Sequence, residues 1–264
     1  MAPHHVLVLG GHGKIAQFLT PLLLRRAWAV TSIIRNPDQV SAIEKLGNDI
    51  QGEKGPLKVL VRSLDDVKSE AQAKTIIDEV NPDYIVWSAG AGGKGGPART
   101  YAIDRDAAIH FIRAAAATPS VTRFLMVSYL ASRRTQPAWW SAADWAASVK
   151  TNQTVLSNYY EAKLAADEVL YEVSKQRGPV FVGINLRPGT LSLDPAGPVE
   201  LGKTKGSGGK VSRESVARVA DALLASEGVG NAWLDLLDGE EEIGEAVGRV
   251  VRDRVDAAEG EAIF

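Results

Sequence analysis

The stretch that decides the fold reads VLVLGGHGKIA and covers residues 6–16. Four apolar residues lead into a glycine-rich turn. Apolar residues then recur at helical spacing, at Ile15, Phe18, Leu19, Leu22 and Leu23. A buried strand, a tight turn and an amphipathic helix in this order are typical of the first unit of a parallel α/β sheet.

The spacing of the small residues in this turn has a chemical meaning. Gly10 permits the tight turn, Gly13 lets the backbone approach a phosphate, and Ala16 lets the helix pack close to the sheet. The helix N-terminus then offers N–H groups and a positive dipole end to an anion. We therefore predict a dinucleotide site here, a ligand-free tight turn being the alternative. Its predicted binding residues are Gly10, His12, Gly13, Lys14 and Ile15.

The end of the second expected strand indicates which dinucleotide is bound. It reads Ile33-Ile34-Arg35-Asn36, without the acidic residue that usually holds the ribose 2′-hydroxyl of NAD. The planar guanidinium of Arg35 suits a 2′-phosphate. We therefore predict NADP(H) as the cofactor, with Arg35 and Asn36 at its adenosine end. An ordinary surface arginine is the alternative.

Outward from this stretch, short apolar runs alternate with helical patterns along the whole chain. The expected strands are Val6–Leu9, Ala29–Ile34, Leu57–Val61, Tyr84–Trp87, Phe124–Val127, Val182–Leu186 and Trp233–Leu236. The expected helices are Lys14–Arg26, Pro37–Leu46, Glu70–Val80, Ile103–Ala117, Tyr159–Lys175, Arg213–Ala225 and Ile243–Arg252. The alternation predicts a Rossmann-type, doubly wound α/β fold with a mostly parallel sheet. We expect one domain over residues 1–264, with a small C-terminal subdomain on the substrate side.

Two segments interrupt the alternation. Residues 131–158 separate a strand from its expected helix and carry Arg133, Arg134 and three tryptophans, Trp139, Trp140 and Trp145. This insert would form a substrate wall or lid, or its tryptophans would only pack it onto the domain. Residues 194–210 are expected to form a loop. Its lysines, Lys203, Lys205 and Lys210, would bind an anionic substrate group or remain solvated.

Tyr159 and Lys163 lie four residues apart at the start of an expected helix, so they share one face. A lysine ammonium beside a phenol favours the phenolate, and the phenol can then exchange a proton with a carbonyl or an alcohol. Tyr160 is the competing phenol, three residues from Lys163. We predict Tyr159 as general acid/base and Lys163 as its electrostatic partner, which would also hold the cofactor ribose. A half-exposed helical pair without chemistry is the alternative.

Together with the glycine turn and this pair, Leu186-Arg187-Pro188-Gly189 after the sixth strand resembles the short-chain dehydrogenase/reductase superfamily. The Gly-Gly-His-Gly-Lys-Ile turn and Ser88-Ala89-Gly90-Ala91-Gly92 resemble its atypical, NmrA-like branch, which is related to NAD-dependent epimerase/dehydratases. The resemblance implies that Ser128 is the catalytic serine and that Asp104 replaces a structural asparagine. Ser128 and Tyr159 are 31 positions apart, more than is usual in the superfamily, so the insert must loop out or Ser128 is not the partner. The remaining predicted cofactor-binding residues are Ser63, Leu64, Ser88, Ala89, Gly90, Pro188 and Gly189.

Composition narrows the class of protein further. With 264 residues and a formal net charge of −2, the chain has no general attraction for nucleic acid or anionic membranes. The absence of cysteine excludes disulfides, thiol nucleophiles and zinc–thiolate sites. The histidines show no metal-ligand spacing, so we expect no metal. No signal peptide or membrane span is evident, so we expect a cytoplasmic protein. The oligomeric state is not predicted.

These patterns predict an atypical, NADP(H)-dependent short-chain oxidoreductase acting on a small carbonyl or alcohol. Tyr159, Lys163 and Ser128 would carry the chemistry. Two alternatives share the cofactor site. One is a non-catalytic NADP(H) sensor that regulates a partner protein, and the other is an epimerase or isomerase that oxidises its substrate only transiently.

Overall fold

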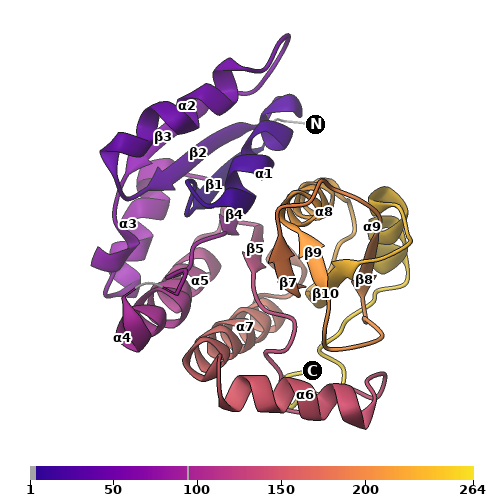
Figure 1. The fold of residues 1–264 in the computed structure, drawn as a ribbon. Coiled ribbons are helices and arrows are strands. Elements are labelled where there is room, and N and C mark those ends of the chain that lie inside the picture. Colours follow the sequence, from indigo (N-terminus) through magenta and orange to yellow (C-terminus); the bar gives the residue numbers. More distant parts are fainter. Residues whose placement is uncertain (1–3, 94) are drawn as a thin grey trace.

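The computed structural model describes residues 4–93 and 95–264, and its centre is an eight-stranded sheet (Figure 1). The strand order is β3-β2-β1-β4-β5-β6-β10-β8, and only β8 runs antiparallel to its neighbour. The chain runs outward from β1 in one direction and then from β4 in the other, which is the doubly wound arrangement. The strands are β1 (His5–Leu9), β2 (Ala29–Ile34), β3 (Leu57–Val61), β4 (Tyr84–Trp87), β5 (Arg123–Val127), β6 (Val182–Pro188), β8 (Val199–Gly202) and β10 (Ala232–Asp238).

Helices cover both faces of the sheet. Helices α1 and α8 pack together on one face, with α9 beside α8, and α3, α5 and α7 lie on the other. The helices are α1 (Lys14–Arg25), α2 (Val40–Asn48), α3 (Glu70–Val80), α4 (Gly96–Thr100), α5 (Ala108–Ala116), α6 (Ala142–Gln153), α7 (Ser157–Arg177), α8 (Arg213–Ala225) and α9 (Ile243–Arg252). Short 3-10 turns lie at Pro37–Gln39, Leu64–Asp66 and Gly178–Val180.

The first strand shows why its sequence is apolar throughout. Val6 and Val8 belong to the core between the sheet and α1, whereas Leu7 and Leu9 belong to the core on the opposite face. All four side chains are fully buried. A central parallel strand buries both of its faces, so its residues do not alternate between apolar and polar.

Three segments differ from the sequence expectations. The helix expected from Ile103 starts earlier, as α4 followed by a π-helical segment, Tyr101–Ala107, that leads into α5. The insert contains α6, whose first turn is capped by the Ser141 hydroxyl accepting a hydrogen bond from the Asp144 N–H (3.0 Å). The expected loop 194–210 contains β8, a strand too short to show a periodic pattern, which is stabilised by its pairing with β10.

A two-stranded ribbon lies beyond the end of β6. It pairs β7 (Thr190–Ser192) in parallel with β9 (Lys210–Ser212), and β9 continues directly into α8. The ribbon and the edge of the sheet around β8 form the small C-terminal part that the sequence predicts. In the ranges that the structure covers, no helix combines the length and the hydropathy needed to cross a membrane.

Candidate functional site

The glycine turn after β1 requires glycine at its first position. Gly10 has a φ of +85°, and an added Cβ would lie 2.7 Å from the Cα of Ala89. The turn is closed by the Gly13 N–H, which donates to the Gly10 carbonyl (2.8 Å). Glycine at position 10 therefore allows both the backbone conformation of the turn and the close approach of the loop after β4.

The N-terminus of α1 is open to a ligand. Its N-cap is Gly13, no side chain caps it, and its first turn carries no acidic residue. In the described part of the chain, the N–H groups of Lys14, Ile15 and Ala16 have no hydrogen-bond acceptor. Unsatisfied N–H groups at the positive end of a helix dipole fit an anion such as a pyrophosphate.

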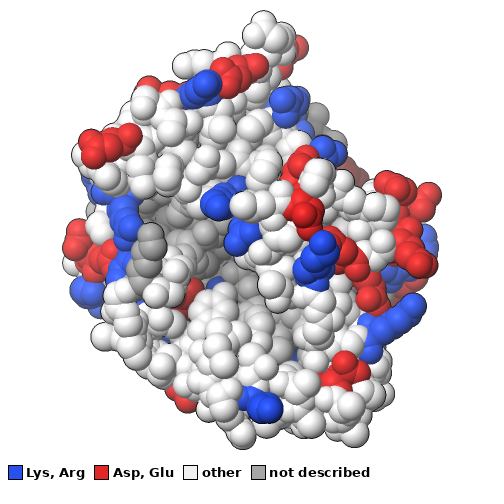
Figure 2. All heavy atoms as spheres, viewed as in Figure 1, with Lys and Arg blue, Asp and Glu red and all other residues white. Residues whose placement is uncertain are grey.

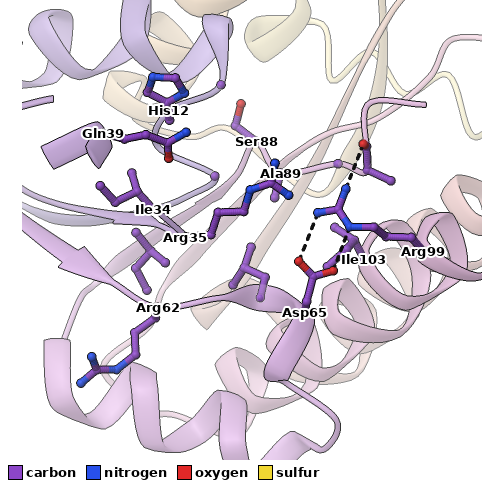
Figure 3. Close-up of a pocket in the computed structure, with 16 residues that line it drawn as sticks. His12, Ile34, Arg35, Gln39, Arg62, Asp65, Ser88, Ala89, Arg99 and Ile103 are labelled. Carbon is purple, nitrogen blue, oxygen red and sulfur yellow. Dashed lines mark hydrogen bonds and ion pairs between the residues drawn. The ribbon is translucent and has the colours of Figure 1, made fainter. Parts of the chain in front are cut away.

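A pocket of about 200 Å³ extends from this turn toward the ends of β2 and β3 (Figure 3). Arg35 reaches across it toward Ala89, and its side chain makes no hydrogen bond or ion pair with any described residue. Its charge does act on the Asp65 carboxyl of the same pocket, where it helps to lower the pKa. An exposed guanidinium that forms no ion pair can accept a phosphate without breaking an existing contact. The predicted residues that line this pocket are Gly10, His12, Gly13, Arg35, Leu64, Ser88, Ala89 and Gly90.

The same pocket contains residues that the sequence analysis missed. Arg62 follows β3 and extends away from Arg35, within 3.6 Å of the Glu79 carboxylate. Arg99 binds Asp65 through two hydrogen bonds (3.0 and 3.1 Å), and this contact lowers the pKa of the Asp65 carboxyl. The position of Arg62 directly after a strand was the one signal available in the sequence, because ligands in such folds bind at the carboxyl ends of strands.

A second pocket of about 650 Å³ continues from the first along the carboxyl ends of the strands. Both pockets are lined by Gly13, Ser88 and the Ala89–Ala91 segment, so together they form one groove. Figure 2 shows a hollow on this face of the molecule, with Lys and Arg side chains along its walls. The predicted residues that line the second pocket are Gly13, Lys14, Ile15, Ser88, Ala89, Gly90, Ser128, Tyr159 and Lys163.

Lys163 is buried at the floor of this second pocket. Its side chain is 1% exposed, and its Nζ donates a hydrogen bond to the Val127 carbonyl (2.8 Å). Burial lowers the pKa of Lys163, while Asp104 and Asp167 oppose this shift. Burial also raises the pKa of Asp104, whose carboxylate accepts a hydrogen bond from the Ala91 N–H (2.9 Å). Asp104 thus holds the loop after β4 against the π-helical segment Tyr101–Ala107.

The structure distinguishes between the two candidate phenols. Tyr159 lines the pocket, whereas the Tyr160 hydroxyl points elsewhere and donates to the Arg133 carbonyl (3.0 Å). Burial raises the pKa of Tyr159, and the nearby carboxylates of Asp104 and Asp167 raise it further. The direction of this shift is opposite to the one expected for a phenol beside a lysine, because burial and the two carboxylates dominate it.

Ser128 lies at the end of β5, at the same pocket as Tyr159 and Lys163. It is 4% exposed, and its hydroxyl forms no hydrogen bond within the described ranges. Burial raises the pKa of the nearby Asp167 carboxyl, and the Ser128 hydroxyl is among the groups that oppose this shift. A buried hydroxyl without a partner beside a pocket fits a hydrogen bond to a ligand. The 30 residues between Ser128 and Tyr159 do not separate the two in space, because the insert loops out and returns so that both line the same pocket.

Four predicted cofactor-binding residues lie outside the lining of both pockets. Asn36 and Ser63 instead cap the short helical turns at Pro37–Gln39 and Leu64–Asp66, accepting backbone hydrogen bonds from Asp38 and Asp65. Pro188 ends β6, and an added Cβ on Gly189 would lie 2.5 Å from Leu237. Among the residues that the structure describes, no three His, Asp or Glu side chains are grouped so as to hold a metal ion.

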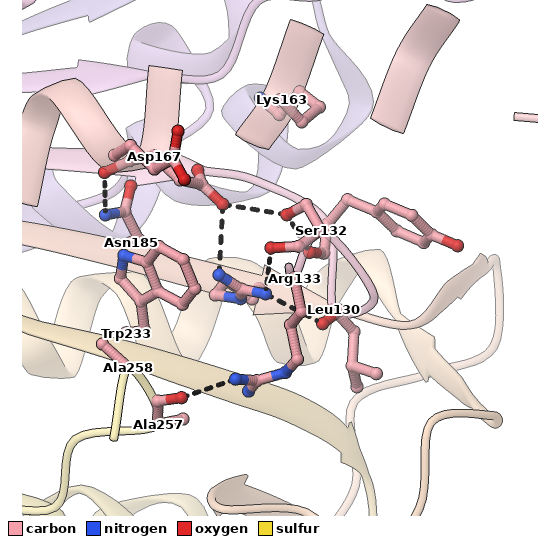
Figure 4. A network of polar contacts seen from close by, with 12 residues as sticks. Leu130, Ser132, Arg133, Lys163, Asp167, Asn185, Trp233, Ala257 and Ala258 are labelled. Atoms are coloured by element: carbon pink, nitrogen blue, oxygen red, sulfur yellow. Dashed lines mark hydrogen bonds and ion pairs between the residues drawn. The ribbon is translucent and has the colours of Figure 1, made fainter. Parts of the chain in front are cut away.

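The insert is tied to the molecule by a buried polar network, and Figure 4 shows part of it, where Arg133 donates to the Ala257 carbonyl. Arg187 pairs with Asp167 (3.3 Å) and with Asp235 (3.2 Å), and Asp235 pairs in turn with Arg133 of the insert. All four side chains are fully buried. Asp167 is one helical turn beyond Lys163 in α7, so this network connects α7 with β6, β10 and the insert.

The tryptophans of the insert face this network and the C-terminal part rather than the groove. Trp139 and Trp140 lie over the Arg133 guanidinium, at 5.5 and 5.0 Å from ring centre to Cζ. The Trp140 Nε1 donates to the Thr204 carbonyl (3.0 Å), and neither pocket is lined by a tryptophan. The tryptophan-bearing part of the insert is therefore packed onto the domain, and Arg133 is fully buried beneath it rather than at the groove. The end of the insert does line the second pocket, through Val155, Leu156 and Asn158.

The lysines of the segment 194–210 are also away from the groove. Lys203 pairs with Glu259, and Lys210 pairs with Asp194 (2.7 Å). Lys205 is exposed and lines neither pocket. These side chains are solvated and ion-paired at the surface.

Comparison with known proteins agrees with this geometry. The family described as NAD(P)H-binding matches residues 10–227. The chain is 30% identical to UPF0659 protein C216.03 of Schizosaccharomyces pombe, over 91% of this chain and 92% of that protein. It is 28% identical to the uncharacterized sugar epimerase YhfK of Bacillus subtilis, over 92% and 98% of the two chains.

Solved structures share the fold at lower identity. A putative NAD-dependent epimerase/dehydratase from Bacillus halodurans superposes with a TM-score of 0.73 at 23% identity, over 93% of this chain and 99% of that one. Gre2 of Candida albicans, solved with NADPH, gives 0.66 at 16% identity, over 90% and 79%. The chain thus belongs to the NAD(P)H-binding family, and it shares its fold with these solved structures.

Proposed function

We propose that this protein is an NADP(H)-dependent oxidoreductase that reduces a small carbonyl compound. The observation that supports this most strongly is the continuity of the groove. Arg35, which forms no ion pair with a described residue, lies at one end of the groove. The open N-terminus of α1 lies in the middle, and Tyr159 and Ser128 lie at the other end. This order matches the 2′-phosphate, pyrophosphate and nicotinamide of the cofactor.

Arg35 would hold the 2′-phosphate, and the N–H groups at the start of α1 would hold the pyrophosphate. When bound, the cofactor supplies the hydride that the carbonyl carbon accepts. Ser128 donates a hydrogen bond to the carbonyl oxygen, and Tyr159 passes its phenolic proton to that oxygen, which completes the alcohol. The raised pKa of Tyr159 keeps the phenol protonated, which is the form that can donate to the carbonyl oxygen.

Lys163 has a positioning role in this scheme. Its Nζ is fixed by the Val127 carbonyl, at the end of the strand that carries Ser128. The ammonium thereby joins α7 to β5 and keeps Tyr159 and Ser128 at the same pocket. Its charge also balances the two buried carboxylates, Asp104 and Asp167.

The Tyr159→Phe variant tests this proposal. We expect NADPH oxidation with any accepted aldehyde or ketone to fall about 100-fold or more, since a positioned general acid contributes on that order. NADPH affinity should stay the same, because the phenol is not needed to hold the cofactor. In the wild type, kcat for reduction should stay level as the pH rises to about 10, the ordinary pKa of tyrosine, because the pKa of Tyr159 is raised above that value.

Tyr160→Phe is the matched control and should leave turnover unchanged, because its hydroxyl binds the backbone outside the groove. Unchanged turnover in Tyr159→Phe would contradict the acid role. If the wild type binds NADPH and reduces no carbonyl, the protein is a cofactor-binding sensor rather than a reductase.

An epimerase is a second candidate, favoured by the likeness to the relative named as a sugar epimerase. It would use the same groove, but each turnover would return the cofactor to its starting oxidation state. Stoichiometric conversion of NADPH to NADP+ with a carbonyl substrate distinguishes the reductase from the epimerase.

A further inference from the structure

One more cation lines the second pocket, on an element that the proposed chemistry does not use. Arg213 is the first residue of α8 and directly follows β9 of the small ribbon. It is partly buried, and it lines the pocket together with Leu191 of the paired strand β7. The ribbon and the helix start therefore fix Arg213 at the substrate side of the groove.

The Arg213 guanidinium is held at one of its ends only. Its Nη1 donates to the carbonyls of Leu191 and Ser192, both at 2.9 Å. Its Nε and Nη2 have no acceptor, and no carboxylate pairs with it, among the residues that the structure describes. The edge formed by Nε–H and Nη2–H is the one that binds a carboxylate through two parallel hydrogen bonds.

The position of this charge is unfavourable without a ligand. A cation in the first turn of a helix faces the positive end of the helix dipole. The neighbouring cations are neutralised, since Arg218 pairs with Glu214 and Lys210 with Asp194. Arg213 differs from both of them, because it forms no ion pair with a carboxylate in the part of the chain that the structure describes.

The lining of the pocket combines aliphatic side chains, Leu191, Leu156 and Val155, with polar ones such as Asn158 and Tyr159. Of the other cations that line it, Lys163 binds the Val127 carbonyl, and Lys14 lies at the N-terminus of α1, beside the expected pyrophosphate. Arg213 is thus the cation on the ribbon side of the pocket, and its one open edge suits a single carboxylate on a short body with an aliphatic part.

We infer that Arg213 binds the carboxylate of the substrate, so that the preferred substrates are small aliphatic oxo acids. This inference rests on the proposed reductase activity and adds its substrate class. The carboxylate would anchor the molecule at the ribbon while its carbonyl lies at Ser128 and Tyr159.

The test compares three oxo acids, pyruvate, acetoacetate and levulinate, with their methyl esters, which keep the carbonyl but lose the charge. For at least one pair, we expect kcat/KM of the acid to exceed that of the ester by about tenfold or more, the usual effect of a hydrogen-bonded charge. Arg213→Met should reduce this ratio to about one, and Arg213→Lys should restore part of it. Arg218→Met, on the same helix and outside the pocket, should keep the wild-type ratio.

A binding measurement makes the test independent of turnover. Calorimetric titration of the NADP+-saturated protein with the same acids should show binding that Arg213→Met loses and Arg218→Met keeps. If the acids bind in this way but none is reduced, the proposed reductase fails and the carboxylate site stands. If esters are reduced as well as acids, or no acid binds better than its ester, the carboxylate site is overturned. A loss of NADPH affinity of about tenfold or more in Arg213→Met would assign the arginine to the cofactor and also overturn it.

Discussion

Arg35 carries the proposed preference for the phosphorylated cofactor. It extends into the pocket beside Ala89 and makes no ion pair with another described residue, so its charge is available to a ligand. Arg62 lies nearby, but Glu79 already lies within 3.6 Å of it. The two arginines are therefore not equivalent, although both line the pocket.

Replacing Arg35 by methionine tests this assignment at the level of one residue. We expect NADPH affinity to fall by about tenfold to 100-fold, the range of a hydrogen-bonded charge pair, and NADH affinity to stay nearly constant. Fluorescence titration of the two cofactors measures both. Arg113→Met, an exposed change on α5 outside the groove, should alter neither affinity. Equal losses for NADPH and NADH would instead place Arg35 away from the 2′-phosphate.

Individual site residues could be predicted where the chemistry is local in the sequence. Gly10, Gly13 and Ala16 are three residues apart, and Tyr159 precedes Lys163 by one helical turn, so their spacing alone brings them together. Arg62 and Arg213 reach the groove from distant elements; the place of Arg62 directly after a strand is a weak signal, and Arg213 has none. The raised pKa of Tyr159 depends first on burial and then on Asp104, 55 positions earlier, so the sign of the shift could not be obtained from the sequence.

At the scale of elements, the turn between β1 and α1 links folding with binding. Gly10 adopts a positive φ and touches the loop after β4, so the same residue shapes the turn and brings Ala89 to the groove. The open end of α1 depends on this geometry, because the Gly13 N–H donates back to Gly10.

Gly10→Ala should therefore destabilise the protein and remove cofactor binding. The left-handed backbone and the close contact with Ala89 should together lower the free energy of unfolding by at least about 2 kcal/mol. Chemical denaturation and NADPH titration measure the two effects. Gly248→Ala makes the same change at an exposed, unobstructed position of α9, and it should raise stability by about 0.5–1 kcal/mol. Full stability of Gly10→Ala would contradict this account of the turn.

Long elements with strong patterns could be predicted, and short ones could not. The seven expected strands are all present, because a buried parallel strand is a continuous apolar run. β7, β8 and β9 contain only three or four residues each, and they exist because partner strands satisfy their backbone groups. The helix α6 was missed because its apolar residues are few and scattered, while its N-cap, Ser141, is a local signal that could have shown where it begins.

At the scale of the whole molecule, the buried ion pairs connect parts of the chain that are far apart in sequence. Asp235 of β10 lies between Arg187 of β6 and Arg133 of the insert, and Arg133 also donates to the Ala257 carbonyl (2.6 Å). The C-terminal segment and the insert are thus joined through Arg133. The sequence contains no sign of these pairs, because each forms only when the strands have assembled.

Asp235→Asn should weaken the whole assembly. Removing this buried carboxylate leaves Arg133 without an ion pair and Arg187 with Asp167 alone, which costs on the order of 3–5 kcal/mol of unfolding free energy. Urea denaturation followed by circular dichroism measures this loss. Asp253→Asn breaks an exposed pair with Arg252 and should cost less than about 1 kcal/mol. A similarly small loss of unfolding free energy in Asp235→Asn would show that the buried ion pairs contribute little to stability.

A crystal structure of the protein with NADP+ tests the central proposal most directly. We expect the 2′-phosphate beside Arg35, the pyrophosphate at the N-terminus of α1, and the nicotinamide in the pocket of Ser128 and Tyr159. A carbonyl placed for hydride transfer should then lie within about 3 Å of both hydroxyls, the reach of a hydrogen bond. A nicotinamide bound so that Tyr159 cannot reach such a carbonyl would contradict the proposed reductase.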